Sequence, residues 1–457
     1  MSQPIQAAAD LNAPPVTKIL AQFVQSHPSK GWSPEVDHEA HRTFLNWLGC
    51  AIGAANHESV TSSLAAIQEF QPAPQASILG RKERVDMGGA ALINGISSHT
   101  FDFDDTHLKT VIHPAGPVAS AILALGENMQ ASGRQLIDAL VLGIDVSCRV
   151  GNAMYPDHYH RGWHITGSTG MLGSAAACAR LMGLDAHKTS MALGIAASQP
   201  IGVREQFGTM TKPFHPGGAA RAGQLSALLA KHGFTSSSKA LEAGRGFMQT
   251  VSTKYDWSEI ERELGKAFEI SLNTYKPFAC GIVIHPAIDA CAQLRAQGVT
   301  ADEIERIELR THPLVLELTG KKTPKDGLEG KFSVYHGCAA GLIFGQASEN
   351  EYADDIVNRA DVVALRAKVN VTTDASIKEA SVDLLATLTN GKEIHIYVEN
   401  AIGSLENPMS DRQLEQKFIA LTEPVIGKAK TNLLISAVWK LGDAPDLKNI
   451  LHLCIPD

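Results

Sequence analysis

Apolar residues recur with a helical period through the first part of the chain. After Pro34, one helical face carries apolar side chains at positions 44, 45, 48, 51 and 52, a spacing typical of an amphipathic helix. The sequence keeps this pattern to about residue 270 and is rich in Ala and Gly, as in residues 173–180. Because small residues let helix axes approach closely, the pattern predicts a compact helical bundle.

The pattern changes near residue 270 to the alternation that is typical of strands. Apolar and polar residues alternate in residues 307–310, 369–371, 382–388 and 394–398. Asn390-Gly391 separates the last two runs and predicts a hairpin in which both turn residues have positive φ. After Asn407-Pro408 the helical pattern returns.

These patterns predict a mostly α protein with an α+β insertion. We expect a large all-helical domain formed by both chain ends and a smaller α+β lid domain. The predicted boundaries are 1–269 for the first part of the helical domain, 270–402 for the lid domain and 403–457 for the C-terminal return to the helical domain.

Charge and composition restrict the possible partners. The chain has 457 residues, of which 44% are hydrophobic, and its formal net charge is −8. It has no block of Lys or Arg, so we expect no nucleic-acid partner. A net-negative protein that binds an anion must gather its cationic side chains in one place, so a candidate anion site should hold Lys, Arg and His close together.

The termini and the cysteines bear on the cellular compartment. Residues Met1–Ala13 are polar and small and do not resemble a secretory leader, and no apolar stretch reaches the ~18 residues that span a bilayer. The seven cysteines form no CxxC pair, which favours buried free thiols over disulfides or a zinc knuckle. We therefore expect a cytoplasmic protein with no membrane partner.

The stretch His99–His107, followed by His113-Pro114, concentrates titratable groups. It holds three carboxylates (Asp102, Asp104 and Asp105) and three histidines within fifteen residues. One interpretation is a metal site, another is an acid/base cluster whose carboxylates orient His113, and a third is a solvated helix end. The aromatic residues between the aspartates argue against a fully exposed face.

Two further segments offer groups that could bind an anion. His164 precedes a stretch rich in glycine and hydroxyl groups, which could begin a helix and present backbone N–H groups to an anion. No strand precedes this stretch, so a nucleotide cofactor is not expected. Lys212 precedes Pro213, which predicts an extended conformation. Lys212 could anchor a carboxylate or donate a proton, or it could be a surface lysine beside a turn.

Two more lysine-containing segments follow in the second half. Lys276-Pro-Phe repeats the string that begins at Lys212 and lies near the predicted domain junction, where ligand sites are frequent. Lys331 to His336 precedes a helix of small residues. The sequence has no GxSxG, Walker or HExxH motif, so it offers no support for a serine hydrolase, an NTPase or a zincin.

Taken together, these motifs resemble the MmgE/PrpD family, which includes 2-methylcitrate dehydratase, cis-aconitate decarboxylase and iminodisuccinate epimerase. The resemblance rests on His99–His107, on the segments that begin at Lys212 and Lys276, and on residues 403–411, and it runs from about residue 15 to the C-terminus. It implies a helical domain built from both chain ends, an inserted lid, a homodimer, and catalysis with no metal and no organic cofactor.

The resemblance also implies a set of site residues. His113, Lys212, Asp102 and His164 are the candidate catalytic residues; Thr106, Lys276, His107, Tyr335 and His336 are candidate substrate-binding residues. In this hypothesis the two lysines and His164 hold carboxylates, and His113 transfers a proton and is oriented by Asp102. Tyr335 and His336 lie where the pocket of the decarboxylases often offers a tyrosine.

The predicted function is a cofactor-independent lyase that moves a proton next to a carboxylate of a small polycarboxylic acid. A dehydratase of the 2-methylcitrate type, a carbon–oxygen lyase, is the first expectation. The alternatives are decarboxylation of cis-aconitate and epimerisation of an iminodisuccinate-like acid. More remote alternatives are a metal-dependent hydrolase that uses Asp102, Asp104, Asp105 and His107, and a non-catalytic carboxylate-binding protein.

Overall fold

The structure is a computed structural model that describes residues 13–28 and 30–457. The chain forms two compact units. The first comprises Met1–Thr100, Asp104–Asn273 and Asp411–Asp457, and the second comprises Phe101–Phe103 and Thr274–Ser410. The expectation that Met1–Ala13 contains no secretory leader concerns residues that lie, except for Ala13, outside the described part of the chain.

The first unit is helical and uses both ends of the chain, which confirms the predicted fold class. Its helices are α1 (Val16–Ser26), α2 (Pro34–Gly53), α3 (Glu58–Gln68), α4 (Met87–Thr100), α5 (Ala115–Met129), α6 (Gly133–Met154), α7 (Asp157–His160), α8 (Ile165–Leu181), α9 (Ala186–Ala196), α10 (Thr211–Lys231), α11 (Phe247–Val251), α12 (Ser258–Glu261), α19 (Asp411–Ile426), α20 (Lys428–Trp439) and α21 (Lys448–Leu453). Short strands β1 (Ala76–Ser77) and β2 (Arg84–Val85) pair with each other, and β3 (Asp105–His107) carries part of the candidate site.

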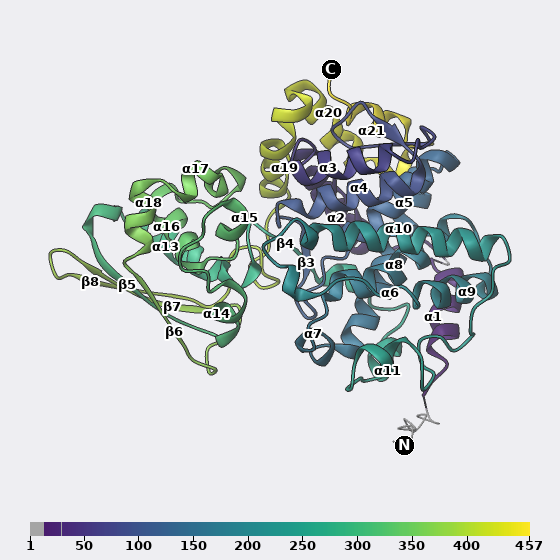
Figure 1. Ribbon diagram of the computed structural model, residues 1–457, viewed down its shortest axis with the longest axis horizontal. Helices are drawn as coiled ribbons and strands as arrows, with labels where there is room; N and C mark the ends of the chain where they lie inside the picture. Colours follow the sequence, from purple (N-terminus) through teal and green to yellow (C-terminus); the bar gives the residue numbers. More distant parts are fainter. Residues whose placement is uncertain (1–12, 29) are drawn as a thin grey trace. The chain divides into compact units, whose positions relative to one another are not determined.

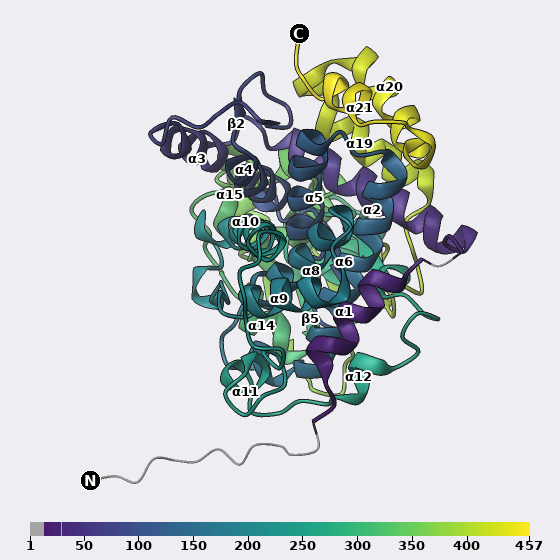
Figure 2. The same cartoon turned by 90° about the vertical axis from the view of Figure 1, so that its right-hand side faces the viewer.

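Helix α8 lies in the middle of the first unit, where it packs against α5, α6, α9 and α10 (Figure 2). It is buried along almost its whole length because its residues are small or apolar, as the Ala-Gly-rich sequence predicts. The C-terminal helix α19 packs against α2, so the two ends of the chain meet in one core (Figure 1). Helix α2 begins at Pro34, one residue after its N-cap Ser33, and buries the apolar face read from the sequence.

The second unit is an α+β fold with one mixed sheet. Its helices are α13 (His285–Ala296), α14 (Pro313–Thr319), α15 (Gly327–Gly330), α16 (Val334–Phe344), α17 (Asp354–Val357) and α18 (Ala360–Arg366), and its strands are β5 (Ile304–Thr311), β6 (Val369–Thr373), β7 (Val382–Leu388) and β8 (Glu393–Val398). The strand order is β6-β5-β7-β8, and only the β5–β6 pair is parallel. A further strand, β4 (Asn273–Tyr275), contains the division between the units. Helices α13 and α16 pack on each other and on the sheet.

The hairpin at Asn390-Gly391 forms as predicted, but its turn differs in detail. Leu388 and Lys392 are paired through a backbone hydrogen bond of 2.8 Å, so three residues form the loop. Only Gly391 has positive φ, at 81°. The expectation of positive φ at both residues is therefore wrong, because a three-residue loop needs just one left-handed residue after its turn.

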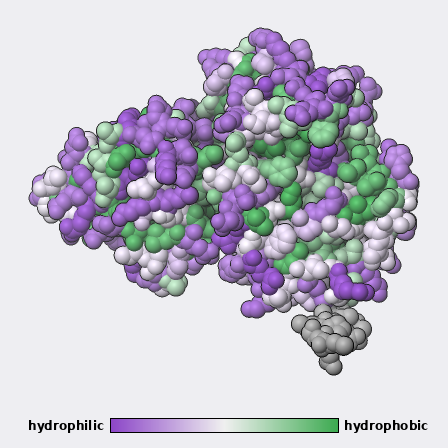
Figure 3. All heavy atoms as spheres, viewed as in Figure 1, coloured by the Kyte–Doolittle hydropathy of each residue, from purple (hydrophilic) through white to green (hydrophobic). Residues whose placement is uncertain are grey.

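The surface, the helices and the cysteines can each be compared with what the sequence predicts. On the face shown in Figure 3, hydrophilic and hydrophobic residues are intermixed. Among the described residues, no helix combines the length and the apolar character that a membrane span requires. All seven cysteines are buried and free, which confirms the sequence prediction.

Two glycines set the crossing of α4 and α10. A Cβ atom on Gly95 of α4 would lie 2.5 Å from the Cα atom of Gly217 in α10, and one on Gly217 would lie 2.3 Å from the carbonyl oxygen of Leu92. Only glycine allows this separation of the two backbones. The crossing matters for the site because α4 ends beside His99 and α10 begins beside Lys212.

Gly95→Ala is expected to lower the free energy of unfolding by about 1–3 kcal/mol, because the added methyl group forces the two helices apart. Urea denaturation measures the change. Ser62→Ala on the exposed face of α3 is the control and is expected to change it by no more than about 0.5 kcal/mol. Equal stability of the Gly95 variant and the wild type would contradict the tight crossing.

Candidate active site

His99, in the last turn of α4, forms a buried pair with Asp104. Its Nδ1 lies 2.7 Å from Asp104 Oδ2, and both side chains are fully buried. Because a carboxylate accepts, Nδ1 carries the proton. The other ring nitrogen, Nε2, is buried and has no hydrogen-bond partner among the described residues. The sequence analysis did not select His99, although it begins the motif that drew attention to this segment.

His113 is held by hydrogen bonds from its ring and from its backbone. Nδ1 lies 2.7 Å from the backbone oxygen of Asp105 and 3.2 Å from Thr106 Oγ1, and the backbone N–H donates to Thr166 Oγ1 at 3.1 Å. A carbonyl only accepts, so Nδ1 is the protonated nitrogen. In the neutral ring, Nε2 then keeps a lone pair that can take or return a proton. Asp104 Oδ1 lies 3.7 Å from Nδ1 and places a negative charge beside the ring.

His164 is the N-cap residue of α8, so the helix that the glycine- and hydroxyl-rich stretch predicts does begin here. Its Nδ1 lies 2.8 Å from Nδ1 of His215 in α10, and one proton is shared between them. Burial, followed by the charges of His99 and Lys212, holds the pKa of His164 well below its usual range. Burial likewise lowers the pKa of His215 to about 4, so both rings are neutral near pH 7.

Lys212 lies in the first turn of α10, so the predicted extended conformation is wrong. Pro213 is tolerated because the N–H groups of the first turn have no partner within the helix. The alternative of a surface lysine is also wrong, since Lys212 is only 6% exposed. Its Nζ lies 5.3 Å from the centre of the Phe207 ring, within range of a cation–π interaction.

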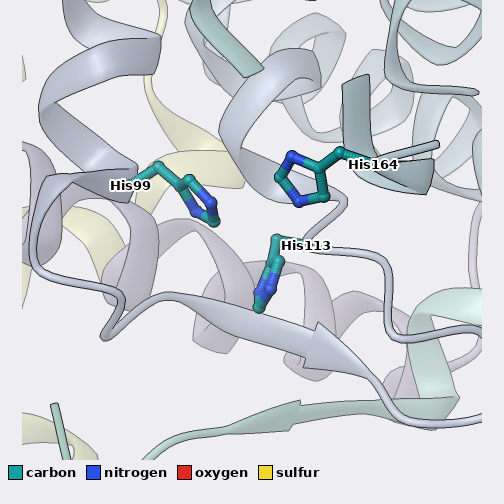
Figure 4. A group of neighbouring side chains, drawn as sticks. All are labelled: His99, His113 and His164. Carbon is teal, nitrogen blue, oxygen red and sulfur yellow. The ribbon is translucent and has the colours of Figure 1, made fainter. Parts of the chain in front are cut away.

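Three histidines therefore converge in the first unit. His99, His113 and His164 each offer a ring nitrogen within 4.8 Å of the others, and Figure 4 shows the three side chains as neighbours. The ring centres of His99 and His113 are 4.8 Å apart. Such a group can hold a proton, bind a carboxylate or coordinate a cation.

The strand behind these rings is held by further buried groups. Asp105 Oδ2 accepts hydrogen bonds from the Ala115 N–H at 3.1 Å and from Asn273 Nδ2 at 2.8 Å. Burial, together with the charge of Asp104, raises the pKa of Asp105 to about 7. His107 uses both ring nitrogens within the unit, with Nε2 2.9 Å from Glu269 and Nδ1 2.7 Å from Thr110. A role for His107 in substrate binding stays a prediction.

The remaining candidates belong to the second unit. The Lys276 ammonium donates to Asp102 Oδ1 at 2.8 Å and to the Asp102 carbonyl at 3.0 Å. His336 is fully buried, with Nε2 2.9 Å from the Glu351 carbonyl, and burial lowers its pKa to about 4. Tyr335 lies beside it in α16 and is 9% exposed. The roles predicted for these residues stay predictions.

Comparison with known proteins identifies the family. The model of the MmgE/PrpD N-terminal domain matches residues 18–260, and that of the MmgE/PrpD C-terminal domain matches residues 278–441. The chain belongs to the MmgE/PrpD family. The resemblance read from the motifs is thus confirmed.

Individual relatives within the family cover most of the chain. A cis-aconitate decarboxylase of Mus musculus is 28% identical over 96% of this chain and 93% of its own length. A cis-aconitate decarboxylase of Homo sapiens is 30% identical over 78% of this chain and 77% of its own length. A 2-methylcitrate dehydratase of Escherichia coli (strain K12) is 25% identical over 73% of each chain. The chain is therefore a family enzyme whose decarboxylase relatives are more similar to it than its dehydratase relatives.

In this family member, a buried ion pair supports the strand that carries Thr106. Arg149 of α6 donates through Nε to Asp145 at 2.6 Å and also to the carbonyl groups of Arg262, at 2.6 Å, and Ala267, at 2.8 Å. The other Asp145 oxygen accepts from the N–H of Glu269 at 2.9 Å. Burial acts to raise the pKa of Glu269, but the hydrogen bond and charge of His107 outweigh it, so the pKa lies below its usual value. A continuous series of buried hydrogen bonds and ion pairs therefore connects α6 to β3.

Arg149→Met is expected to lower the free energy of unfolding by about 3–5 kcal/mol, because it leaves Asp145 buried without its cation and several carbonyl groups without a donor. Thermal and urea denaturation measure the change. Arg161→Met removes an exposed arginine and is expected to cost no more than about 0.5 kcal/mol. Similar losses in the two variants would contradict a stabilising role for the buried pair.

Proposed function

We propose that the enzyme removes one carboxylate, as CO₂, from a small unsaturated tricarboxylic acid of the cis-aconitate type, without a cofactor. The observation that carries this proposal is the buried group of three imidazoles next to the Lys212 ammonium. The similarity to decarboxylases over most of the chain supports decarboxylation over the dehydration that the sequence analysis favoured.

Binding needs positive charge, and Lys212 supplies it where little water competes. A buried ammonium that binds a carboxylate forms a charge-assisted hydrogen bond, which is stronger than one between neutral groups. His164 can add an N–H donor from Nε2 when His215 holds the shared proton. A neutral His164 does not repel Lys212, so the two can hold one carboxylate together.

The chemical step leaves an electron pair on carbon. When the C–C bond to the leaving carboxylate breaks, CO₂ departs and its bonding electrons remain on a carbanion next to another carboxylate. The Lys212 charge stabilises this anionic transition state more than the bound acid, because charge moves from the leaving group onto the remaining fragment. A proton then closes the sequence by forming a C–H bond.

We assign this proton transfer to His113. Its Nδ1 proton is held by the Asp105 carbonyl, so Nε2 is the nitrogen that exchanges a proton with the substrate. The Asp104 carboxylate, which also pairs with His99, lies 3.7 Å from the His113 ring and stays beside it during the transfer. Proton transfer by a positioned side chain contributes roughly 10²–10⁴-fold to a rate.

The other predicted residues complete the proposal. We propose that Thr106 orients His113 and contributes to substrate binding. We also propose substrate-binding roles for Lys276, which is paired with Asp102, and for Tyr335, His107 and His336. We also propose that the enzyme acts as a homodimer, as the family resemblance implies, and that it works in the cytoplasm, where buried free thiols stay reduced.

Lys212→Met is expected to reduce kcat/KM for cis-aconitate by at least about 10²-fold, since it removes the charge that stabilises the transition state and keeps most of the side-chain volume. CO₂ release measures turnover, and circular dichroism checks the fold. Lys231→Met, at the exposed end of the same helix, is the matched control and is expected to retain activity. Wild-type turnover in a folded Lys212 variant would remove this residue from the site.

Turnover in D₂O is expected to place one deuterium on the carbon that receives the proton, as proton NMR of the product will show. His113→Ala is expected to slow this incorporation by about 10²–10⁴-fold, whereas His187→Ala, which removes an exposed imidazole, leaves it unchanged. Parallel reactions with citrate, 2-methylcitrate and iminodisuccinate test the other activities. If the enzyme removes water from 2-methylcitrate and releases no CO₂ from cis-aconitate, it is a dehydratase and the proposed decarboxylation is wrong.

A further inference from the structure

The first unit contains a cavity of about 1270 Å³ that is separate from the candidate active site. Its walls come from the end of α9 and the residues after it, from residues 234–246, and from α11. None of the candidate catalytic or substrate-binding residues lines it. Among the described residues the lining has no Asp, Glu, His or Cys, so the cavity offers no acid–base pair and no thiol for catalysis.

Two cations, Lys239 and Arg245, are the charged residues of the described lining. Neither side chain forms an ion pair or a hydrogen bond with another described residue. Glu242, the one carboxylate between them in the sequence, is buried and accepts from the N–H of Thr17 at 3.2 Å and from its hydroxyl at 2.6 Å. In a chain of net charge −8, two such cations on one cavity attract an anion.

The backbone at Gly244-Arg245-Gly246 adds hydrogen-bond donors to the same cavity. The N–H groups of Gly244 and Arg245 have no partner among the described residues. Successive backbone N–H groups are typical of phosphate-binding loops, and glycine lets a ligand approach the chain closely. The Ser237 hydroxyl accepts from the Lys239 N–H at 3.2 Å and can still donate its own proton. Side chains and backbone together therefore suit a phosphate group.

An aromatic ring, that of Phe234, also lines the cavity and is 57% exposed. Phe247 and several aliphatic side chains extend this apolar lining. An exposed ring face can stack on a nucleotide base. The segment is held in place before a ligand binds, because Ser236 Oγ donates to the Met191 carbonyl of α9 at 3.1 Å, and a wall that is already ordered binds at a lower entropic cost.

We propose that this cavity binds a nucleoside monophosphate, which the enzyme holds without converting it. A phosphate monoester carries a charge of about −1.5 to −2 at pH 7, which matches one ammonium and one guanidinium. Its oxygens accept from Lys239, from Arg245 and from the Gly244 N–H, and its base stacks on Phe234. Charge-assisted hydrogen bonds to the phosphate supply most of the affinity.

Isothermal titration calorimetry of the full-length protein with AMP tests this binding. We expect one AMP per chain, weaker binding of inorganic phosphate, which lacks the base, and no measurable binding of adenosine, which lacks the phosphate. Lys239→Met/Arg245→Met is expected to weaken AMP binding by at least about 100-fold, because each hydrogen bond to a charged group contributes a factor of about 10 or more. Both side chains are exposed, so we expect this variant to fold.

Two control variants separate the cavity from other anion sites. Lys231→Met/Arg161→Met loses the same charge outside the cavity and is expected to bind AMP like the wild type. Lys212→Met, which removes the buried lysine of the candidate active site, is also expected to keep AMP binding. Phe234→Ala tests the base separately: we expect it to weaken AMP binding about 10-fold and to leave the binding of inorganic phosphate unchanged.

Four outcomes would overturn the site. They are no AMP binding, wild-type AMP affinity in Lys239→Met/Arg245→Met, equal affinities for adenosine and AMP, and wild-type AMP affinity in Phe234→Ala. Loss of AMP binding in Lys212→Met would assign the nucleotide to the candidate active site and would also contradict the proposal. None of these measurements uses turnover, so failure of the cavity and failure of the proposed function are distinguishable.

Discussion

The close crossing of α4 and α10 is the constraint on which the candidate site depends. Backbone meets backbone at Gly95 and Gly217, where no other residue fits. The end of α4 then presents His99, and the beginning of α10 presents Lys212 and His215. Helix α8 packs against α10 and has His164 as its N-cap residue, so three helix ends contribute to one buried place.

Burial at this place does more than exclude water. It keeps His164 and His215 neutral beside a lysine, because a second positive charge among buried groups costs more than an uncharged ring. The neighbouring carboxylates are used differently: Asp104 holds a proton of His99, whereas Asp105 ties the strand to α5 and to Asn273. These fixed partners determine how the three rings can exchange a proton or bind a carboxylate.

Buried polar contacts outside the candidate site also hold its residues in position. Arg149 and Asp145 join α6 to the segment that ends at Glu269, and Glu269 holds His107 of β3. Buried ion pairs of this kind add little net stability, but the loss of one partner strongly lowers the free energy of unfolding, because the other charge stays buried and unpaired. The network therefore restricts where β3 can lie, and with it Thr106 and the ring of His113.

The sequence alone determined the fold class, the hairpin in the second unit, the free buried thiols and the family. All of these depend on local periods or on motifs that are contiguous along the chain. It also pointed to the segments that carry His113, His164 and Lys212. It did not select His99 or the pairing of His164 with His215, and it placed Lys212 in extended chain. Those features were decided by the tertiary structure. The partner of each ring nitrogen depends on groups that fold against the ring, and packing decides whether a lysine before proline begins a helix.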